Sequence, residues 1–399
     1  MDIIATKTLN TNKHKLSFLD KMCAMFFFLS LVLNDTFGEM VTLNALPKAA
    51  ILAFMVLILC IMLTNVVKIS ITVIVFLVLN VFWWGLSCFW TASPTIAFFS
   101  TLSQNVLFCF FVFIYFYNYK NYDLYFYAMF ASGFLLMIYS FFTYGFDGFI
   151  EALQEGERMG YGITNANTYG KVFAHSVVAG LYILLFKSKK LLGLASIVFL
   201  LLAFSSGSKK SIVIIILSAA ILLILKFGRK NKFMLLVIAI ILFLIFYFAI
   251  QLPLFETIRD RLETFISGDK NYSDQLREDM IDRGIELFKQ KPIAGWGIEA
   301  YATISGFDTY SHNNYVELLV NYGIIGLCLY YVIHLFTLLK LRYSVKLGDH
   351  RYYMILAVFL SAIVTEYGMV SYGIKSNWIM LGVAMAMAVN SRDKYVMRE

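Results

Sequence analysis

Arginine and histidine side chains in the most polar part of the chain have the chemistry needed to hold an anion and to accept a proton. Most of the sequence is apolar, but one long polar interruption runs from Gln251 to Ser311. It contains Arg277 and Arg283, and His312 follows where the chain becomes apolar again. Arginine holds oxyanions through paired hydrogen bonds, and a neutral imidazole accepts a proton from a hydroxyl group. These residue types indicate a site that can hold an oxyanion beside a base.

The position of His312 favours a role as the base. We predict that Ser311 is the N-cap of the next helix, which would place His312 in the first turn, near the positive end of the helix dipole. A neutral imidazole is favoured over imidazolium there. In the competing interpretation, His312 is a capping or hydrogen-bonding residue, and Arg277 and Arg283 are solvated charges on a surface helix. Glu317 is a second, weaker candidate base.

The two arginines fall on a predicted amphipathic helix over Gln275–Gln290. Pro292 ends this helix, and a Gly-Trp-Gly turn around Trp296 follows, with the indole expected at the membrane interface. We expect the helix to lie on the outer membrane surface with its apolar stripe down. Its apolar positions recur at helical spacing: Leu276, Met280, Gly284, Leu287 and Phe288.

Composition places these residues on a membrane protein. Hydrophobic residues make up 60% of the chain and charged residues only 15%, and the mean hydropathy is +0.75. A soluble protein carries about 25% charged residues. Long apolar runs recur along the whole chain, each close to the roughly 20 residues that an α-helix needs to cross a bilayer. We therefore predict an all-α, polytopic helical membrane protein with about 12 transmembrane helices and one large extracytoplasmic loop.

The predicted organisation has three parts. Residues 1–250 form an N-terminal transmembrane region of about nine helices. Residues 251–311 form the large extracytoplasmic loop with its amphipathic helix, and residues 312–399 form the C-terminal transmembrane helices with a short cytoplasmic tail. The predicted spans are Phe18–Leu33, Ala45–Leu63, Ile69–Trp90, Thr95–Tyr117, Leu124–Tyr144, Tyr169–Phe186, Leu191–Ser205, Ser211–Leu225, Phe233–Ile250, Tyr315–Leu339, Tyr352–Val370 and Asn377–Val389.

The basic residues give the orientation. The net charge of +8 comes from lysines and arginines that cluster at the ends of spans, which indicates topology and argues against a nucleic-acid partner. Both termini and the basic loops at 187–190, 226–232 and 340–351 fall on one side, which is predicted to be cytoplasmic. The segment 205–210 is an exception, because it is basic and yet must face outside. Its lysines either bind an anion or extend to the interface from two short spans.

The five cysteines lie in or near apolar runs and lack the spacing of a metal site or of a disulfide framework. We interpret them as small buried apolar residues.

The motif around the polar loop resembles the signature of a known family. Arg277 is followed by Pro292-x-x-Gly-x-Gly297, then by Ser311-His-Asn-Asn-Tyr-x-Glu317 and Tyr322-Gly-x-x-Gly326. This pattern resembles the O-antigen ligase and O-antigen or capsular polysaccharide polymerase superfamily of bacterial inner-membrane proteins, over Ser273–Tyr331. Two weaker matches are Gly162-Ile-Thr-Asn-Ala-Asn167, before a span, and Ser206-Gly-Ser-Lys-Lys210, after another.

The resemblance implies a glycosyltransferase that needs no metal or other cofactor and acts at the outer face of the inner membrane. Arg277 would hold the pyrophosphate of an undecaprenyl-pyrophosphate-linked glycan, and His312 would be the base. Lys209 takes the place of an intramembrane arginine, and a lysine lacks the paired donors of a guanidinium. The tryptophan often found shortly after the loop arginine is missing, and Ile281 lies in that region. The other residues expected to bind pyrophosphate or glycan are Lys210, Arg283, Asn167, Asn313 and Glu317.

Two activities of the family compete. A polymerase joins lipid-linked repeat units, whereas a ligase moves the finished glycan to lipid A-core or another acceptor. We favour the polymerase, because surface-glycan gene clusters supply many divergent polymerases and the Asn-, Lys-, Ile- and Phe-rich composition fits such a cluster. A polysaccharide flippase is a remote alternative. The partners expected are the lipid-linked glycan, the bilayer and, for a polymerase, a chain-length regulator.

Overall fold

A computed structural model describes residues 18–40, 42–154, 158–160, 162–187, 189–228 and 272–396, together with the single positions 233, 247, 251 and 259. The predicted span Phe233–Ile250 and the start of the polar loop lie almost wholly outside the described residues. The helices are α1 (Phe18–Phe37), α2 (Ala45–Thr64), α3 (Ile71–Ser87), α4 (Ala97–Tyr119), α5 (Asp123–Gln154), α6 (Ala166–Phe186), α7 (Lys190–Leu194), α8 (Ser196–Ser205), α9 (Lys209–Phe227), α12 (Tyr272–Gln290), α13 (Ala300–Ile304), α14 (Asn314–Leu347), α15 (His350–Thr365) and α16 (Lys375–Val396), with the short 3-10 helix η2 at Glu366–Gly368.

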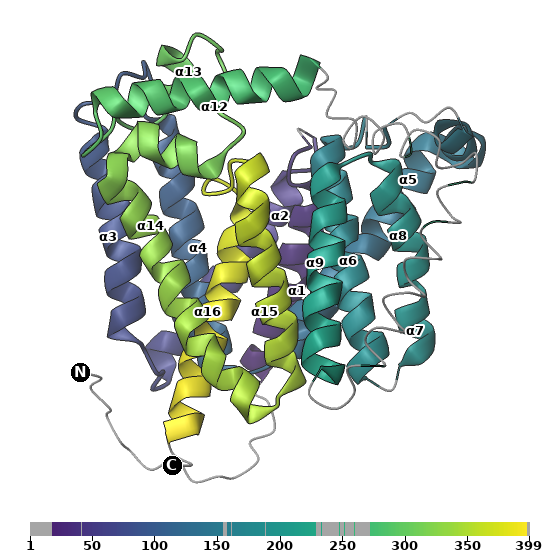
Figure 1. The fold of residues 1–399 in the computed structure, drawn as a ribbon. Coiled ribbons are helices and arrows are strands. Elements are labelled where there is room, and N and C mark those ends of the chain that lie inside the picture. The colour runs from purple at the N-terminus through teal and green to yellow at the C-terminus, as the bar shows by residue number, and fades with distance from the viewer. Residues whose placement is uncertain are drawn as a thin grey trace.

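Most of these helices run side by side in one bundle (Figure 1). Helix α16 lies inside it and packs against α4, α14 and α15. Residues 383–388 alternate between small and flexible apolar side chains and have no exposed surface. Small side chains let neighbouring helices approach closely, which is how helices associate where lipid removes the hydrophobic driving force.

Six helices of the described chain are long and apolar enough to cross a membrane. They are Ala45–Thr64, Ala97–Tyr119, Asp123–Gly148, Ala166–Phe186, Lys209–Phe227 and Asn314–Tyr343. Their outward sides carry exposed apolar residues, such as Leu52 on α2 and Ile216 on α9. This is the arrangement expected of helices that face lipid. The total of about 12 spans stays a prediction.

Several boundaries differ from the prediction. The span predicted at Leu191–Ser205 consists of the two short helices α7 and α8, which meet at Ala195. Helix α5 runs on to Gln154, past a kink at Gly145.

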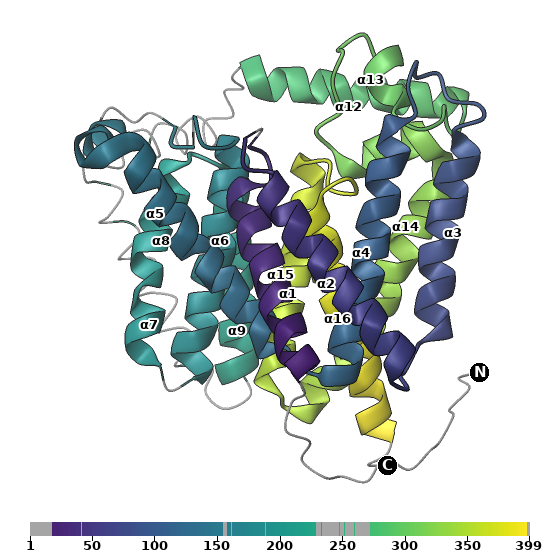
Figure 2. The same ribbon diagram turned by 180° about the vertical axis from the view of Figure 1, so that it is seen from behind.

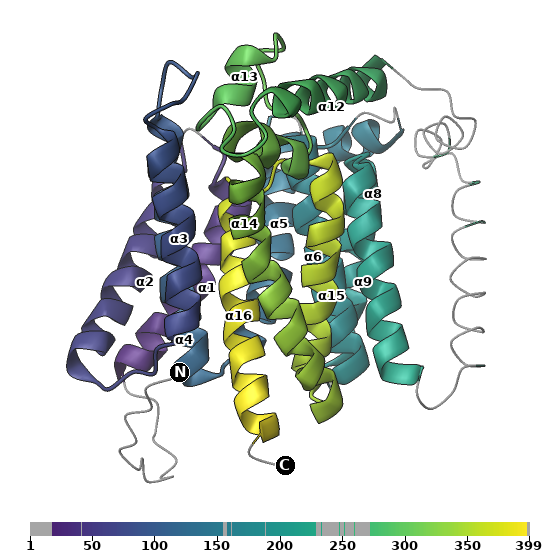
Figure 3. The ribbon, with the colours of Figure 1, turned by 60° about the vertical axis from the view of Figure 1, so that its left-hand side comes forward.

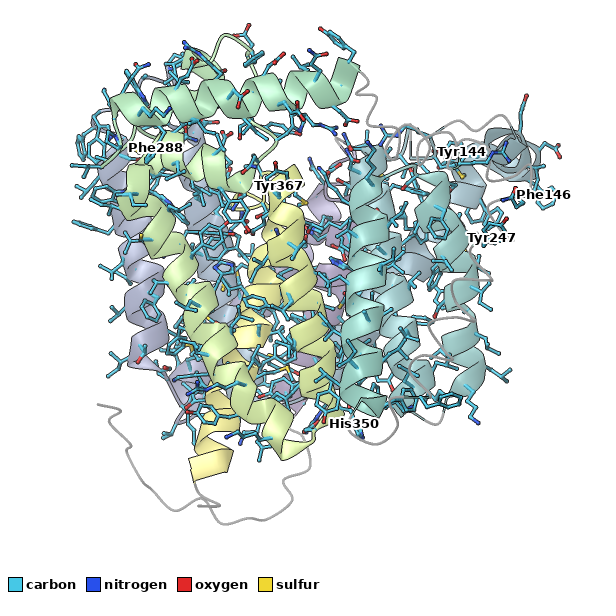
Figure 4. The ribbon with its side chains drawn as sticks, viewed as in Figure 1. Tyr144, Phe146, Tyr247, Phe288, His350 and Tyr367 are labelled. Atoms are coloured by element: carbon cyan, nitrogen blue, oxygen red, sulfur yellow. The ribbon has the colours of Figure 1, made fainter. Side chains whose placement is uncertain are left out.

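Helix α12 lies across one end of the bundle, with α13 beside it (Figures 1 and 3). Helix α1 begins and α16 ends at the opposite end (Figure 2). His350, at the start of α15, also lies at that opposite end, far from Phe288 of α12 (Figure 4).

The apolar stripe of α12 packs on protein, so the prediction that this stripe faces the membrane is wrong. Met280 and Leu287 are buried in a small core with Tyr301 of α13 and with Val316 and Val320 of α14. A neighbouring position of the stripe is a glycine for a steric reason: a Cβ on residue 284 would come within 2.2 Å of the Val316 side chain. The stripe therefore positions α12 over the start of α14.

Helix α14 is interrupted at Gly323, which has the glycine-only backbone angles φ 66° and ψ −170°. The interruption frees backbone groups, and the turn after α12 pairs with them. The backbone N–H of Trp296 donates to the carbonyl of Val320 at 2.8 Å, and the N–H of Ile324 donates to the carbonyl of Pro292 at 2.9 Å. The Pro-x-x-Gly-x-Gly motif therefore attaches the segment after α12 to α14.

Candidate functional site

His312 lies in the connection between α13 and α14, just outside the helix. The cap of α14 is Asn313, whose side-chain oxygen accepts hydrogen bonds from the backbone N–H groups of Tyr315 (3.0 Å) and Val316 (3.1 Å). The prediction of Ser311 as the N-cap is therefore wrong, because the amide of Asn313 makes these bonds instead. His312 precedes the cap and has a left-handed backbone with φ 57°, an uncommon conformation for a residue with a side chain.

Glu317 holds the backbone next to His312. Its carboxylate is 4% exposed and accepts a hydrogen bond of 2.7 Å from the backbone N–H of Ser311. The side-chain amide of Asn321 donates to the same carboxylate at 3.4 Å. Glu317 was expected to contact substrate or to be a second base, and in the structure its bonds run to the protein itself.

Asn314 attaches the same connection to the segment before α16. Its side-chain oxygen accepts from the backbone N–H groups of Ser371 (2.7 Å) and Tyr372 (3.0 Å). Its side-chain amide donates to the hydroxyl of Tyr331 at 3.0 Å, and that hydroxyl donates to Glu366 at 2.6 Å. The backbone on both sides of His312 is thus fixed by buried side chains.

The surroundings of His312 favour the neutral imidazole. Burial, and after it the positive charges of Arg277 and Lys210, lower the pKa of His312 to about 4. The ring of Tyr310 covers one side, with the two ring centres 4.4 Å apart. Because this pKa is well below neutral pH, His312 can accept a proton under physiological conditions.

Several cations surround this histidine. Lys210 lies in the first turn of α9. Its ammonium group is repelled by the positive charges of Arg277, Lys171 and Arg158. Like charges brought together in a partly buried place form a site for an anion. The positive charges of Arg277 and Lys210 also oppose the protonation of His312, so the three side chains form one electrostatic group.

Asp274 connects α12 to the bundle within this group. Its carboxylate forms ion pairs with Lys209 (2.8 Å) and with Arg277 (3.5 Å). The lysine that the resemblance aligns with the family arginine is therefore engaged by a carboxylate, whereas the adjacent Lys210 faces the cations.

Arg158 is a further cation of the site, and no motif in the sequence indicates its role. Its guanidinium donates to the backbone carbonyl of Ser206 (3.2 Å) and to the side-chain oxygen of Asn167 (3.3 Å). Asn167, which was expected to bind substrate, thus holds one edge of Arg158.

The structure brings some predicted residues together and leaves one apart. Arg283 forms an ion pair of 3.0 Å with Glu286 on α12. The positive charge of Arg283 also interacts with the hydroxyl group of Tyr301, in the core beneath that helix. The residues gathered around one place are His312, Arg277, Lys210 and, through intermediate contacts, Lys209, Asn167, Asn313 and Glu317.

A cavity of about 560 Å³ lies beside this group, and Asn167, Lys210 and Tyr310 form part of its wall. The cavity is also lined by Asp35, Lys171 and His175, which belong to none of the sequence motifs. An available signal was the rarity of ionisable side chains within membrane helices, where such residues usually serve a function.

Among the described residues, no group of three or more His, Cys, Asp or Glu side chains is placed to hold a metal ion. The expectation that the reaction needs no metal stays a proposal.

A family model described as O-antigen ligase matches residues 194–331. No curated protein matches the chain. The matched segment contains Lys209, Lys210, Arg277, Arg283, His312, Asn313 and Glu317. The walls of the cavity that come from α1, α4, α6 and α16 lie outside it.

Proposed function

We propose that the chain is a member of the O-antigen ligase and polymerase superfamily, because the family model described as O-antigen ligase matches residues 194–331, and that it polymerises undecaprenyl-pyrophosphate-linked oligosaccharide repeat units into O-antigen or capsular polysaccharide. The observation that carries this proposal is the convergence of a neutral histidine, His312, with Arg277 and Lys210 at the bundle end that α12 covers. A base beside a group of cations matches the two needs of glycosyl transfer from a pyrophosphate.

His312 provides the base. Its ring nitrogen takes the proton of the acceptor hydroxyl while the hydroxyl oxygen forms a bond to the anomeric carbon of the donor sugar. The bond between that carbon and the pyrophosphate oxygen breaks, and its electron pair leaves with undecaprenyl pyrophosphate. Attack opposite the leaving group inverts the anomeric configuration. The proton on His312 is released to water after the product departs.

Arg277 and Lys210 stabilise the leaving group. The pyrophosphate gains negative charge as its bond to the sugar breaks, and positive groups fixed in advance lower the energy of that charge without rearranging. Arg158 and Lys209 extend the same positive region towards α6 and α12. These side chains supply the charge that a divalent cation supplies in other phosphate chemistry, so the proposed transfer needs no metal.

The proposed location is the bacterial inner membrane, with the α12 end outside and both termini in the cytoplasm. The basic loops at 187–190 and 340–351 adjoin the bundle end opposite α12, as expected for cytoplasmic loops. A chain-length regulator is a further proposed partner.

The ligase activity is the second candidate, and the description of the matching family model favours it. Both activities use the same donor, so the same cations and the same base serve either one. They differ in the acceptor, which is a lipid-linked repeat unit for the polymerase and lipid A-core or another surface acceptor for the ligase.

One experiment tests the proposal and separates the two activities. The surface glycan of a deletion strain is run on a gel beside its pool of lipid-linked glycan. A polymerase deletion leaves single repeat units on the acceptor and removes the ladder. If long lipid-linked polymer accumulates and the acceptor is bare, the protein is the ligase. Normal ladders in both pools would contradict both activities.

A further inference from the structure

The cavity beside the cations has walls from parts of the chain that are far apart in sequence. Asp35 comes from the end of α1, Thr101 from α4, Lys171 and His175 from α6, and Ser376 from the start of α16. Lys210 and Tyr310 form its border with the candidate site. Lys210 is close enough to Arg277 for the two positive charges to repel each other. The ring of Tyr310 packs on the ring of His312. A ligand in the cavity would therefore lie next to the proposed reaction centre.

The lining offers many hydrogen-bonding partners to a polyhydroxylated ligand. Most of its side chains are amides, hydroxyls or charged groups, which can both donate and accept hydrogen bonds. The volume of about 560 Å³ is typical of sites that enclose small molecules. The polar lining is formed chiefly by Asn34, Asp35, Thr101, Asn105, Asn167, Lys171, His175 and Lys375.

Two lining groups have hydrogen-bonding capacity that the protein leaves unused. The Nε2 atom of His175 is buried and has no hydrogen-bond partner within the described part of the chain. Asp35 receives a hydrogen bond of 3.2 Å from the hydroxyl of Ser132 and another from the side chain of Asn34, while a carboxylate can accept about four. Buried polar groups are normally satisfied, so open capacity on a cavity wall indicates a ligand that supplies the partners.

Lys171 gives the same wall a fixed donor. Its ammonium group donates to the side-chain oxygen of Asn377 at 2.8 Å. The negative charge of Asp35 attracts the same ammonium group. An ammonium group has three donors, so this lysine can hold Asn377 and a ligand hydroxyl together.

We propose that this cavity is a saccharide-binding site that takes sugar residues of the repeat unit and selects which repeat unit is used. Asp35 accepts hydrogen bonds from sugar hydroxyls, and Lys171 and His175 contribute further contacts. The inference rests on the proposed function, because it names the substrate part that the reaction centre would receive. Most of the wall lies outside the segment that the family model matches, so it can differ between proteins that share the same reaction centre.

Saccharide binding to the purified full-length protein in detergent tests this proposal. The probe is the repeat-unit oligosaccharide released by mild acid from the lipid-linked pool of the host, observed by saturation-transfer NMR. Thr101→Trp places a large ring at the cavity, and Leu107→Trp places the same ring on the outward side of the same helix, where Leu107 is 48% exposed. We expect Thr101→Trp to weaken binding at least tenfold and Leu107→Trp to bind as the wild type does.

A second pair of variants keeps the volume of the side chain. Asp35→Asn removes the carboxylate from the cavity wall, and Asp20→Asn makes the same change in the first turn of α1. Weaker saccharide binding in Asp35→Asn alone is the expected result. Equal binding by both members of each pair and by the wild type would overturn the proposal, as would the absence of binding by the wild type.

Two further arms separate this inference from the proposed function. His312→Ala should bind the saccharide normally and make no polymer, because His312 is outside the cavity wall. A normal glycan ladder in His312→Ala would contradict the proposed function and leave the binding result intact. Excess undecaprenyl pyrophosphate without glycan should leave the saccharide bound, and displacement would show that the cavity holds the pyrophosphate instead.

Discussion

The ammonium group of Lys209 and the carboxylate of Asp274 lie 2.8 Å apart and join the first turn of α9 to the first turn of α12. The same carboxylate contacts Arg277 one helical turn further along α12. This contact brings α12 to the end of a bundle helix and places Arg277 beside Lys210 and His312. It also gives the two adjacent lysines different surroundings, because Lys209 is paired with Asp274 and Lys210 is surrounded by cations.

Lys210→Met should reduce glycan synthesis much more than Lys209→Met. Removing a fixed charge that stabilises a leaving group costs about 10²–10³ in rate. Lys209 is 45% exposed and paired with Asp274, and an exposed ion pair contributes about 0–1 kcal/mol. Polymer synthesis by each variant in proteoliposomes, at equal protein content, measures the difference. Equal losses, or a larger loss in Lys209→Met, would show that Lys209 is the residue that contacts the pyrophosphate.

Glu317→Ala and Glu317→Gln distinguish positioning from catalysis at that residue. Alanine leaves the buried N–H of Ser311 without an acceptor, which should lower the free energy of unfolding by about 1–3 kcal/mol. Glutamine keeps an acceptor oxygen and should retain most of both stability and activity. Thermal unfolding in detergent and polymer synthesis are measured together. If Glu317→Gln is as inactive as His312→Ala while its stability is normal, Glu317 acts as a base.

The ionisation of His312 provides a direct test of the charge arrangement. Burial and the charges of Arg277 and Lys210 hold its pKa at about 4, so the ring should stay neutral down to about pH 5. Arg277→Ala removes one of the positive charges and should shift the pKa upward, towards the ordinary value. NMR of histidine-labelled protein, with the signal assigned by its loss in His312→Ala, follows the titration. A wild-type pKa near 6.5, or a downward shift in Arg277→Ala, would contradict the account.

The break in α14 should be intolerant of any side chain at residue 323. A Cβ there would come within 2.1 Å of the backbone carbonyl oxygen of Ile293, and the backbone has a positive φ. Gly323→Ala should therefore lower the melting temperature clearly and reduce synthesis. Gly348→Ala is the matched control, because residue 348 also has a positive φ, of 69°, but has open space around it. Equal destabilisation of the two variants would mean that the close approach at residue 323 is unimportant.

The helices were largely predictable because lipid imposes one simple rule on the sequence. A helix in a bilayer must satisfy its own backbone and expose apolar side chains, so long apolar runs such as Ala45–Leu63 indicate a helix with nearly correct ends. The amphipathic helix before Pro292 was predictable from the same periodicity. Its contact surface was not, because an apolar stripe packs equally well on lipid and on protein, and only the tertiary structure shows Val316 and Val320 beneath it.

The site was predictable only where its residues lie close together in the sequence. His312 and Arg277 lie on each side of a turn whose Pro and Gly residues mark it in the sequence, and the structure places both beside Lys210. Arg158 and Asp35 come from other helices and join the site and its cavity only through packing. Ser311 and Asn313 are both of residue types that cap helices, and propensity alone cannot tell which of two near neighbours is the cap.

Complementation of a deletion strain tests the central claim most directly. The strain is supplied with the wild type, His312→Ala, Arg277→Ala, and two controls, which are His350→Ala at the opposite end of the bundle and Lys289→Ala in the last turn of α12. Surface glycan is run on a gel, and membrane levels of each protein are matched by immunoblot. The account predicts that His312→Ala and Arg277→Ala lose the polymer ladder and that both controls restore it. A wild-type ladder from His312→Ala at normal protein levels would contradict the assignment of the reaction centre.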